Sequence, residues 1–225
     1  MTATTSGAGN AGPLSERVLI GTPLVRHLAP RLDAVRAGTA RLVIGFGGES
    51  GSGKSETAHA VAETLNAEGI GAVLLNQDDY FLRPPYTNHA WRQGGGLERV
   101  GPQEVDLPRL AAHVAAFRRG DLSITVPRVL YTEDRFVERT LDLDAARVLC
   151  VEGTYVLTLD DLDVRVFLSA THAETAARRA ERARAAEELT PFVARVLAHE
   201  HALIAPHAAR ADFIVDADFR IVAPL

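Results

Sequence analysis

Residues 48–55 read G-E-S-G-S-G-K-S and satisfy the pattern G-x-x-x-x-G-K-[ST] at every fixed position. This pattern describes a P-loop, whose glycines let successive backbone N–H groups turn toward the phosphates of a nucleotide. In such a loop Lys54 reaches the β and γ phosphates, and the Ser55 hydroxyl is a magnesium ligand. The expected nucleotide site comprises Gly48, Glu49, Ser50, Gly51, Ser52, Gly53, Lys54, Ser55 and Glu56.

The segments on either side of the loop support this interpretation. Residues 42–46 form a short apolar run typical of a buried parallel strand, and residues 56–67 carry apolar side chains at helical spacing. A helix that begins near Gly53 directs the positive end of its dipole at bound phosphates. The alternative, a glycine-rich turn that matches by chance, does not account for both flanks.

Composition narrows the class of protein. A chain of 225 residues with 47% hydrophobic and 24% charged residues suits one soluble α/β domain. The net charge of −5 argues against a nucleic-acid or acidic-membrane partner, since these need a basic surface. Cys150 is the only cysteine, which excludes an intrachain disulfide, and its apolar neighbours indicate a buried, inert thiol.

The sequence also predicts how the chain is divided. Residues 1–12 are small and polar, as in a disordered tail, and residues 13–40 suggest a helical extension of two short helices interrupted at residues 21–23. Residues 41–225 form the P-loop domain. The amino terminus lacks a signal-peptide pattern, and no stretch approaches the ~18 apolar residues of a membrane span, so a cytoplasmic protein is expected.

Strand and helix patterns alternate along the P-loop domain. Apolar runs predict strands at residues 70–75, 124–126, 147–151, 164–168 and 213–215. Caps at Asp106, Thr171 and Thr190 predict helices over residues 107–119, 173–188 and from 191 onward. Residues 80–101 show no period, as in a lid or binding loop. The alternation indicates an α/β fold with a central parallel sheet and helices on both faces.

Acidic residues follow two of these strands. Asp78 and Asp79 come directly after the strand that ends at residue 75, and Glu152 ends the strand from residue 147. The P-loop shares this edge, because the carboxyl ends of parallel strands lie together. A carboxylate there suits a general base for an attacking hydroxyl, and Glu152 suits a magnesium site. The alternative is that these acids cap turns.

The chain resembles the group of uridine kinase, phosphoribulokinase and nicotinamide riboside kinase. The resemblance rests on five motifs that occur in order between residues 42 and 215: V-I-G-F-G-G-E-S-G-S-G-K-S, Q-D-D-Y-F, V-E-G-T-Y, R-R-x-x-R and A-D-F-I-V. It implies a nucleoside-kinase-like P-loop domain with a small lid. It also implies that ATP and Mg²⁺ are used to phosphorylate a hydroxyl of a small metabolite. The family includes dimers and tetramers, so a homo-oligomer is compatible with it.

The resemblance implies roles for individual residues. Asp78 matches the general base, and Glu152 matches the acid that assists magnesium. Three arginines match a basic helix beside the lid that clamps the transferring phosphate, namely Arg178, Arg179 and Arg182. The alternative for these arginines is a solvated helix face, since Glu174 and Arg178 form an i,i+4 pair.

The chain departs from the family where the acceptor binds. Val100 replaces the acid that grips the ribose, Asp134 stands where a base-contacting histidine is expected, and Ala183 follows Arg182 in place of the lid pattern. A nucleoside or riboside is still the expected acceptor. The alternatives are a non-nucleoside such as pantothenate, glycerate or a sugar phosphate, and a nucleotide-binding regulator without kinase activity.

Acceptor contacts are expected from residues 80–101 and from the segment after residue 127. The candidates are Asp79, Tyr80, Arg83, Trp91, Arg128, Tyr131 and Asp134, with His89, Arg92, Glu98 and Arg135 nearby. His199, His201 and His207 cluster near the carboxyl terminus. The i,i+2 spacing of His199 and His201 puts them on different helix faces, so a metal site among these three is not expected.

Overall fold

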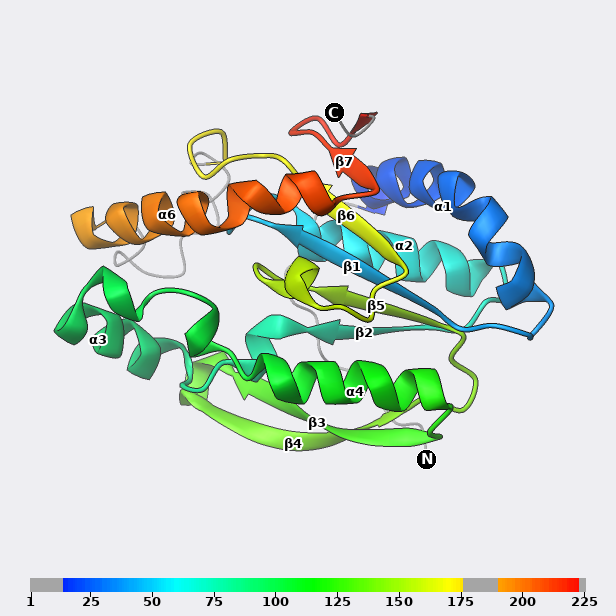
Figure 1. Cartoon of the computed structure of the whole chain (residues 1–225), viewed down its shortest axis with the longest axis horizontal. Coiled ribbons are helices and arrows are strands. Elements are labelled where there is room, and N and C mark those ends of the chain that lie inside the picture. The colour runs from blue at the N-terminus through cyan, green and yellow to red at the C-terminus, as the bar shows by residue number, and fades with distance from the viewer. Residues whose placement is uncertain (1–13, 176–189, 223–225) are drawn as a thin grey trace.

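The computed structural model describes residues 14–175 and 190–222, and its centre is a six-stranded sheet (Figure 1). The strand order is β2-β5-β1-β6-β7-β8, in which the first five strands are parallel and β8 is antiparallel to β7. The fold class predicted from the sequence is confirmed. The strands are β1 Leu42–Gly48, β2 Ala72–Asn76, β5 Val148–Glu152, β6 Val164–Leu168, β7 Phe213–Val215 and β8 Ile221–Val222.

Alternate residues of a strand point to opposite faces of the sheet, and helices cover the side chains on both faces. Ile44 and Phe46 of β1 pack against helices α1 (Leu14–Arg36) and α2 (Lys54–Ala67). Val43 belongs to the core on the other face, with helix α4 (Leu107–Arg119) and the hairpin of β3 (Ser123–Leu130) and β4 (Arg135–Asp142). Figure 1 shows α4 and the hairpin on the opposite side of the sheet from α1 and α2.

The amino-terminal segment is one helix, so the expected break into two short helices is wrong. Gly21 lies against α2, where an added Cβ would come within 2.5 Å of the Ala60 carbonyl oxygen. The glycine therefore lets the two helices approach closely. Leu24 and Leu28 are fully buried in the core that α1 shares with α2. Burial of this apolar face outweighs the weak helix propensity of the Gly-Thr-Pro sequence.

The segment expected to be a long loop contains helix α3 (Pro85–Gly95). Pro85 occupies the first helical position, where proline is tolerated because its missing N–H has no partner in the helix. The Asp134 carboxylate accepts hydrogen bonds from the N–H groups of Tyr86 (2.7 Å) and Thr87 (3.0 Å). A cap supplied by a residue 47 positions away is invisible to local sequence patterns.

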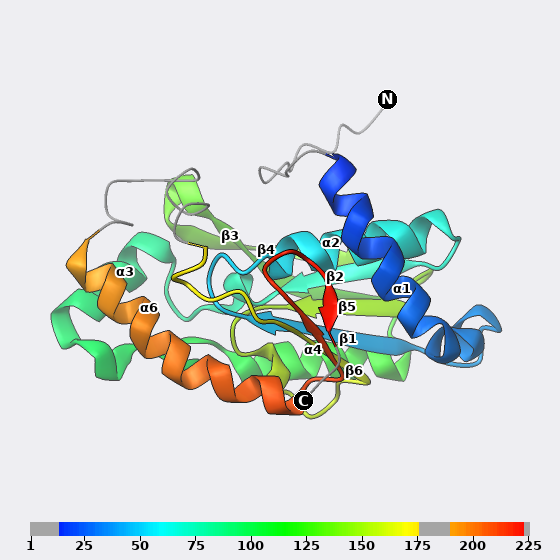
Figure 2. The same cartoon turned by 90° about the horizontal axis from the view of Figure 1, so that it is seen from above.

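Helix α6 (Pro191–Ile204) begins where the sequence predicts, and the Thr190 hydroxyl accepts a hydrogen bond from the Val193 N–H at 3.2 Å. In both views α6 lies beside α3 at one end of the molecule (Figure 2). The Asp106 cap and the capping box of Thr171 and Glu174 are also present. The helix expected over residues 173–188 falls largely outside the described residues, as do the tail at residues 1–12, Arg178 and Arg182.

Two further expectations concern the core and the membrane. Cys150 is fully buried, as expected, and burial raises the pKa of its thiol to about 12. Across residues 14–175 and 190–222, the helices are too short or too polar to cross a bilayer.

Candidate active site

The parallel sheet brings the predicted acidic residues to the P-loop. Glu152 ends β5 and pairs with Phe46 of β1 on one side and with Asn76 of β2 on the other. It therefore lies between the P-loop, which follows β1, and Asp78, which follows β2. This is the carboxyl edge of the sheet, where α/β proteins bind ligands.

The P-loop has the backbone that its glycines permit. Gly53 has φ +97°, in the left-handed region, and α2 begins at the next residue. At Gly48, an added Cβ would lie 2.6 Å from the Leu168 carbonyl oxygen. The amino end of α2 thus opens directly onto the loop, as anion binding requires. Among the described atoms, Ser52 Oγ is buried in this loop without a hydrogen-bond partner.

The side chains of Lys54, Ser55 and Glu152 lie close together beside the P-loop. Lys54 Nζ donates a hydrogen bond to the Glu49 carbonyl oxygen at 3.2 Å. The Glu152 carboxyl is buried, which raises its pKa to about 7, while the Lys54 charge and a hydrogen bond with Ser55 oppose that rise. Hydroxyl and carboxylate oxygens are the donors that Mg²⁺ prefers, so Ser55 and Glu152 fit a magnesium site.

The structure separates the two adjacent aspartates. The Asn76 side chain accepts a hydrogen bond from the Asp78 N–H at 2.8 Å and fixes the turn that carries both. Asp78 faces the cavity described below, and the Tyr131 hydroxyl donates to its Oδ2 at 3.4 Å. Asp79 is buried and accepts a hydrogen bond from the Val129 N–H at 2.8 Å, which anchors β3. Only Asp78 therefore faces space that an acceptor can occupy.

A cavity of about 440 Å³ adjoins the P-loop and Asp78. Its far wall comes from α3 and α6 and contains the side chains of Asn88, Arg92 and Glu200. Nine of the residues predicted from the sequence line this cavity: Ser50, Gly51, Lys54, Ser55, Asp78, Arg83, His89, Arg92 and Tyr131.

Besides Asp79, four further predicted acceptor residues have other contacts and do not line this cavity. The Tyr80 hydroxyl bonds to His113 Nδ1 at 2.8 Å, and Arg128 lies 3.7 Å from the buried Asp79. The Trp91 ring lies between two guanidinium groups, with Arg83 at 4.0 Å and Arg99 at 3.6 Å. Asp134, as described, caps α3.

A buried ionic network supports the wall of the cavity. Of its residues, only Arg92 is predicted from the sequence. Arg92 binds Glu104 through two hydrogen bonds, of 2.7 and 2.9 Å, and contacts Glu200 at 3.1 Å. Asn88 Nδ2 donates to Glu104 Oε1 at 3.0 Å, whereas Asn88 Oδ1 is buried with no partner among the described residues. Burial raises the pKa of Glu200, and the Arg92 charge opposes that rise. Glu200 lies on the buried stripe of α6 with Val196 and Ile204, a signal visible in the sequence.

Replacing Lys54 with alanine is expected to weaken ATP binding by about 10- to 100-fold, the loss of about 1.5–3 kcal/mol for a charged hydrogen bond. Isothermal titration calorimetry with ATP and Mg²⁺ measures this change. Lys54 is the only lysine in the chain, so an amine-reactive ATP analogue has a single lysine to label. ATP affinity that is unchanged in the variant, or labelling that excess ATP does not reduce, would contradict the assignment.

Comparison with known proteins agrees with this geometry. The chain is 32% identical over 190 residues to the bifunctional alpha-galactosidase/sucrose kinase AgaSK of Mediterraneibacter gnavus, a match over 79% of this chain. The chain spans only about a fifth of that relative's length.

Solved structures share the fold at lower identity. One is a possible uridine kinase from Bacillus stearothermophilus, with 18% identity and a TM-score of 0.61 over 89% of this chain and 98% of that one. Another is D-glycerate 3-kinase from Cryptococcus neoformans, with 13% identity and a TM-score of 0.59 over 90% and 97%.

The family description "Phosphoribulokinase / Uridine kinase family" matches residues 43–218, which include the P-loop, Asp78 and Glu152. This match covers more than half of the chain. The chain therefore belongs to the phosphoribulokinase/uridine kinase family.

Proposed function

We propose that this kinase transfers the γ-phosphate of ATP to a hydroxyl group of a carbohydrate. The observation that carries the proposal is the composition of the cavity beside Asp78. Its far wall contains the side chains of Asn88, Arg92 and Glu200, and Asn88 Oδ1 has no partner among the described residues. Such groups bind the hydroxyls of sugars, which both donate and accept hydrogen bonds.

The residues of the chain support the following division of labour. The loop amides and Lys54 bind the phosphates of ATP, and Ser55 with Glu152 holds the magnesium ion. When bound, magnesium neutralises charge on the phosphate oxygens. Asp78 accepts the proton of the attacking hydroxyl as its oxygen bonds to phosphorus and the bond to ADP breaks. Arg178 and Arg182 remain predicted partners of the transferring phosphate.

Sequence similarity supports a carbohydrate as the acceptor. The relative with 32% identity is named as both a galactosidase and a sucrose kinase. The aligned part of this chain is a P-loop kinase, so the second activity is the one relevant here. Sucrose and its component sugars are therefore the first acceptors to test.

The described structure offers less support for a nucleoside. Val100, which replaces the ribose-binding acid of uridine kinases, is buried with 2% of its surface exposed. Asp134, which stands where the base-contacting histidine is expected, binds the amino end of α3. A site that reads a hydroxyl through polar groups loses that recognition when the groups are replaced or engaged elsewhere.

A panel of acceptors tests the proposal. ADP release is measured with ATP and Mg²⁺ in the presence of sucrose, fructose, glucose, uridine, cytidine, nicotinamide riboside, glycerate and pantothenate. We expect a carbohydrate to give a kcat/KM at least about 100-fold above that of any nucleoside, the discrimination that a hydroxyl-reading site can reach. A nucleoside or a carboxylic acid as the best acceptor would overturn the carbohydrate proposal and leave the kinase class intact.

The variant Asn88→Ala tests whether the acceptor binds in this cavity. This variant is expected to raise the KM for the best acceptor about tenfold, since it removes a hydrogen-bonding group worth about 1 kcal/mol or more. The KM for ATP serves as the internal control and stays unchanged. Equal effects on both KM values would place the acceptor elsewhere.

A further inference from the structure

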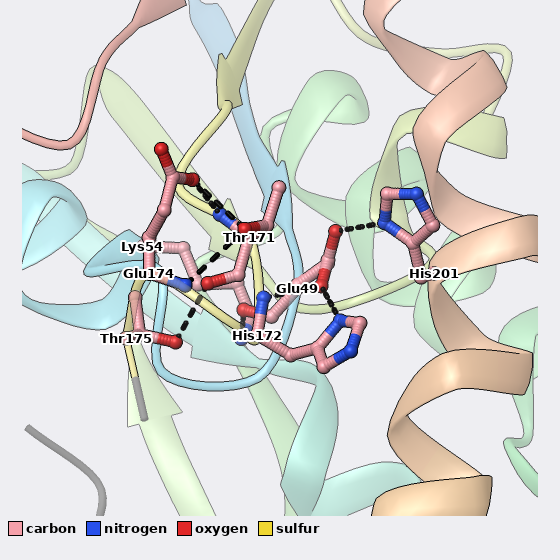
Figure 3. Close-up of polar contacts among 7 residues, drawn as sticks. All are labelled: Glu49, Lys54, Thr171, His172, Glu174, Thr175 and His201. Atoms are coloured by element: carbon pink, nitrogen blue, oxygen red, sulfur yellow. Dashed lines mark hydrogen bonds and ion pairs between the residues drawn. The ribbon is translucent and has the colours of Figure 1, made fainter. Parts of the chain in front are cut away.

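Three side chains from segments distant in the sequence lie together at the P-loop. Glu49 belongs to the loop, His172 follows β6, and His201 lies on α6 (Figure 3). His201 Nδ1 lies 2.6 Å from Glu49 Oε1, and His172 Nδ1 lies 3.0 Å from Glu49 Oε2. We call these three residues the Glu49 cluster. No metal site is expected from the sequence among the carboxyl-terminal histidines, and the structure places His201 beside Glu49 and His172 instead.

The donor atoms of the Glu49 cluster converge. One ligand atom from each residue lies within 4.8 Å of the other two. A zinc ion with ligands at about 2.0–2.1 Å in a tetrahedron separates neighbouring donors by about 3.3 Å. Two donor pairs of the cluster, at 2.6 and 3.0 Å, lie closer together than this, and the ligand atoms lie no more than 4.8 Å apart. Small side-chain rotations therefore bring the donors to the separation that a zinc ion needs.

The carboxylate of the cluster is suited to bind a cation. Glu49 is 5% exposed, and its two carboxylate oxygens face His201 and His172. The backbone N–H of His172 donates to Oε2 at 2.7 Å and orients the group. Carboxylates that bind metals are commonly oriented by such a hydrogen bond.

The donor set selects the kind of metal. Two imidazole nitrogens and one carboxylate oxygen suit zinc and related transition metals, whereas magnesium prefers oxygen donors alone. The side chain of His201 is 43% exposed, which leaves room for water as the fourth ligand. None of the three residues lines the cavity that contains Ser55 and Asp78, so the cluster is distinct from the magnesium site.

We propose that Glu49, His172 and His201 form a binding site for one zinc-type transition-metal ion. The ion replaces the two imidazole–carboxylate hydrogen bonds, and each neutral imidazole then binds the ion through Nδ1 and carries its proton on Nε2. The ion thus connects the P-loop to the segment after β6 and to α6. Lys54 is connected to this site, because its ammonium group donates to the carbonyl oxygen of Glu49. Metal binding therefore holds the loop that binds the phosphates.

Titration of the metal-free protein with Zn²⁺ tests the proposal. The protein is stripped with a chelator and titrated calorimetrically without ATP or Mg²⁺. We expect one ion per chain, with a Kd in the micromolar range or below. A zinc concentration of about 100 times Kd raises the Tm by about 5–10 °C. Co²⁺ in place of Zn²⁺ gives the visible absorption of a tetrahedral site.

Variants assign the binding to the cluster. His172→Ala and His201→Ala are each expected to weaken zinc binding by at least about 100-fold and to abolish the tetrahedral cobalt spectrum. His199→Ala removes a histidine from the same helix outside the cluster and is expected to bind zinc as the wild type does. The Tm of each metal-free variant verifies folding.

Two results would overturn the proposal. One is a wild-type protein that binds no Zn²⁺ below millimolar concentration, which would leave the cluster as a hydrogen-bonded contact only. The other is wild-type zinc affinity in both His172→Ala and His201→Ala. Because no step of this test measures kinase activity, its outcome is independent of the proposed acceptor.

Discussion

Replacing Asp78 with asparagine is expected to lower kcat by about 10³-fold, within the range that a general base contributes. Asparagine has nearly the same size as aspartate and leaves the backbone turn unchanged, but its amide group cannot accept the proton of the attacking hydroxyl. Asp78 is the acid of the adjacent pair that faces the cavity, and its backbone N–H is fixed by Asn76. Steady-state ADP release with the best acceptor measures the change.

Two controls isolate the chemical step. ATP affinity, measured by calorimetry, is expected to stay within about twofold of the wild type, since the proposed phosphate site is the P-loop and does not include Asp78. Tyr131→Phe removes a hydroxyl 3.4 Å from Asp78 and is expected to lower kcat less than about tenfold. A kcat for Asp78→Asn above a tenth of the wild-type value would remove Asp78 from the role of base.

Replacing Arg92 with alanine is expected to lower the free energy of unfolding by about 3–5 kcal/mol, because it leaves two buried carboxylates without their partner. Glu104 is 2% exposed and Glu200 is 9% exposed, and both bind Arg92 directly. The loss corresponds to a Tm lower by about 6–20 °C. Denaturant unfolding, monitored by circular dichroism, provides the measurement.

An arginine in an exposed ion pair serves as the matched control. Arg109 contacts Glu138 at 2.9 Å, and both side chains are more than a third exposed. Arg109→Ala is expected to cost about 1 kcal/mol or less. Equal losses in the two variants would show that the network under the cavity wall contributes no more than a surface ion pair.

Local sequence patterns predict the parts of this fold that local interactions determine. The caps at Asp106 and Thr190 bind N–H groups three residues ahead, so the sequence alone locates those helix starts. Apolar runs locate β5, β6 and β7 because both faces of these strands are covered. The P-loop is predicted in full, since its glycines and α2 are contiguous.

The missed elements depend on contacts between distant residues. Helix α1 is continuous because it packs on α2, and α3 is capped by Asp134 from another segment. Strand β4 is missed because its side chains are mostly exposed and it is held by pairing with β3. In each case tertiary context outweighs the local pattern.

The same distinction applies to the site. The sequence predicts Lys54 and Ser55 from the P-loop motif. It predicts Asp78 and Glu152 because they lie at the carboxyl ends of recognisable strands. Only the family resemblance distinguishes Asp78 from Asp79, because their positions after the strand differ only in the direction that a turn gives each side chain. The Glu49 cluster joins three segments that only the fold brings together, so residue spacing alone does not reveal it.

The most direct test of the account is to identify the phosphorylated product. The wild-type protein is incubated with ATP, Mg²⁺ and sucrose or fructose, and the mixture is followed by phosphorus NMR. We expect a sugar phosphate ester that forms at the rate of ADP release and is absent with Asp78→Asn. ADP release without any phosphorylated acceptor, or a nucleoside monophosphate formed in preference to a sugar phosphate, would contradict it.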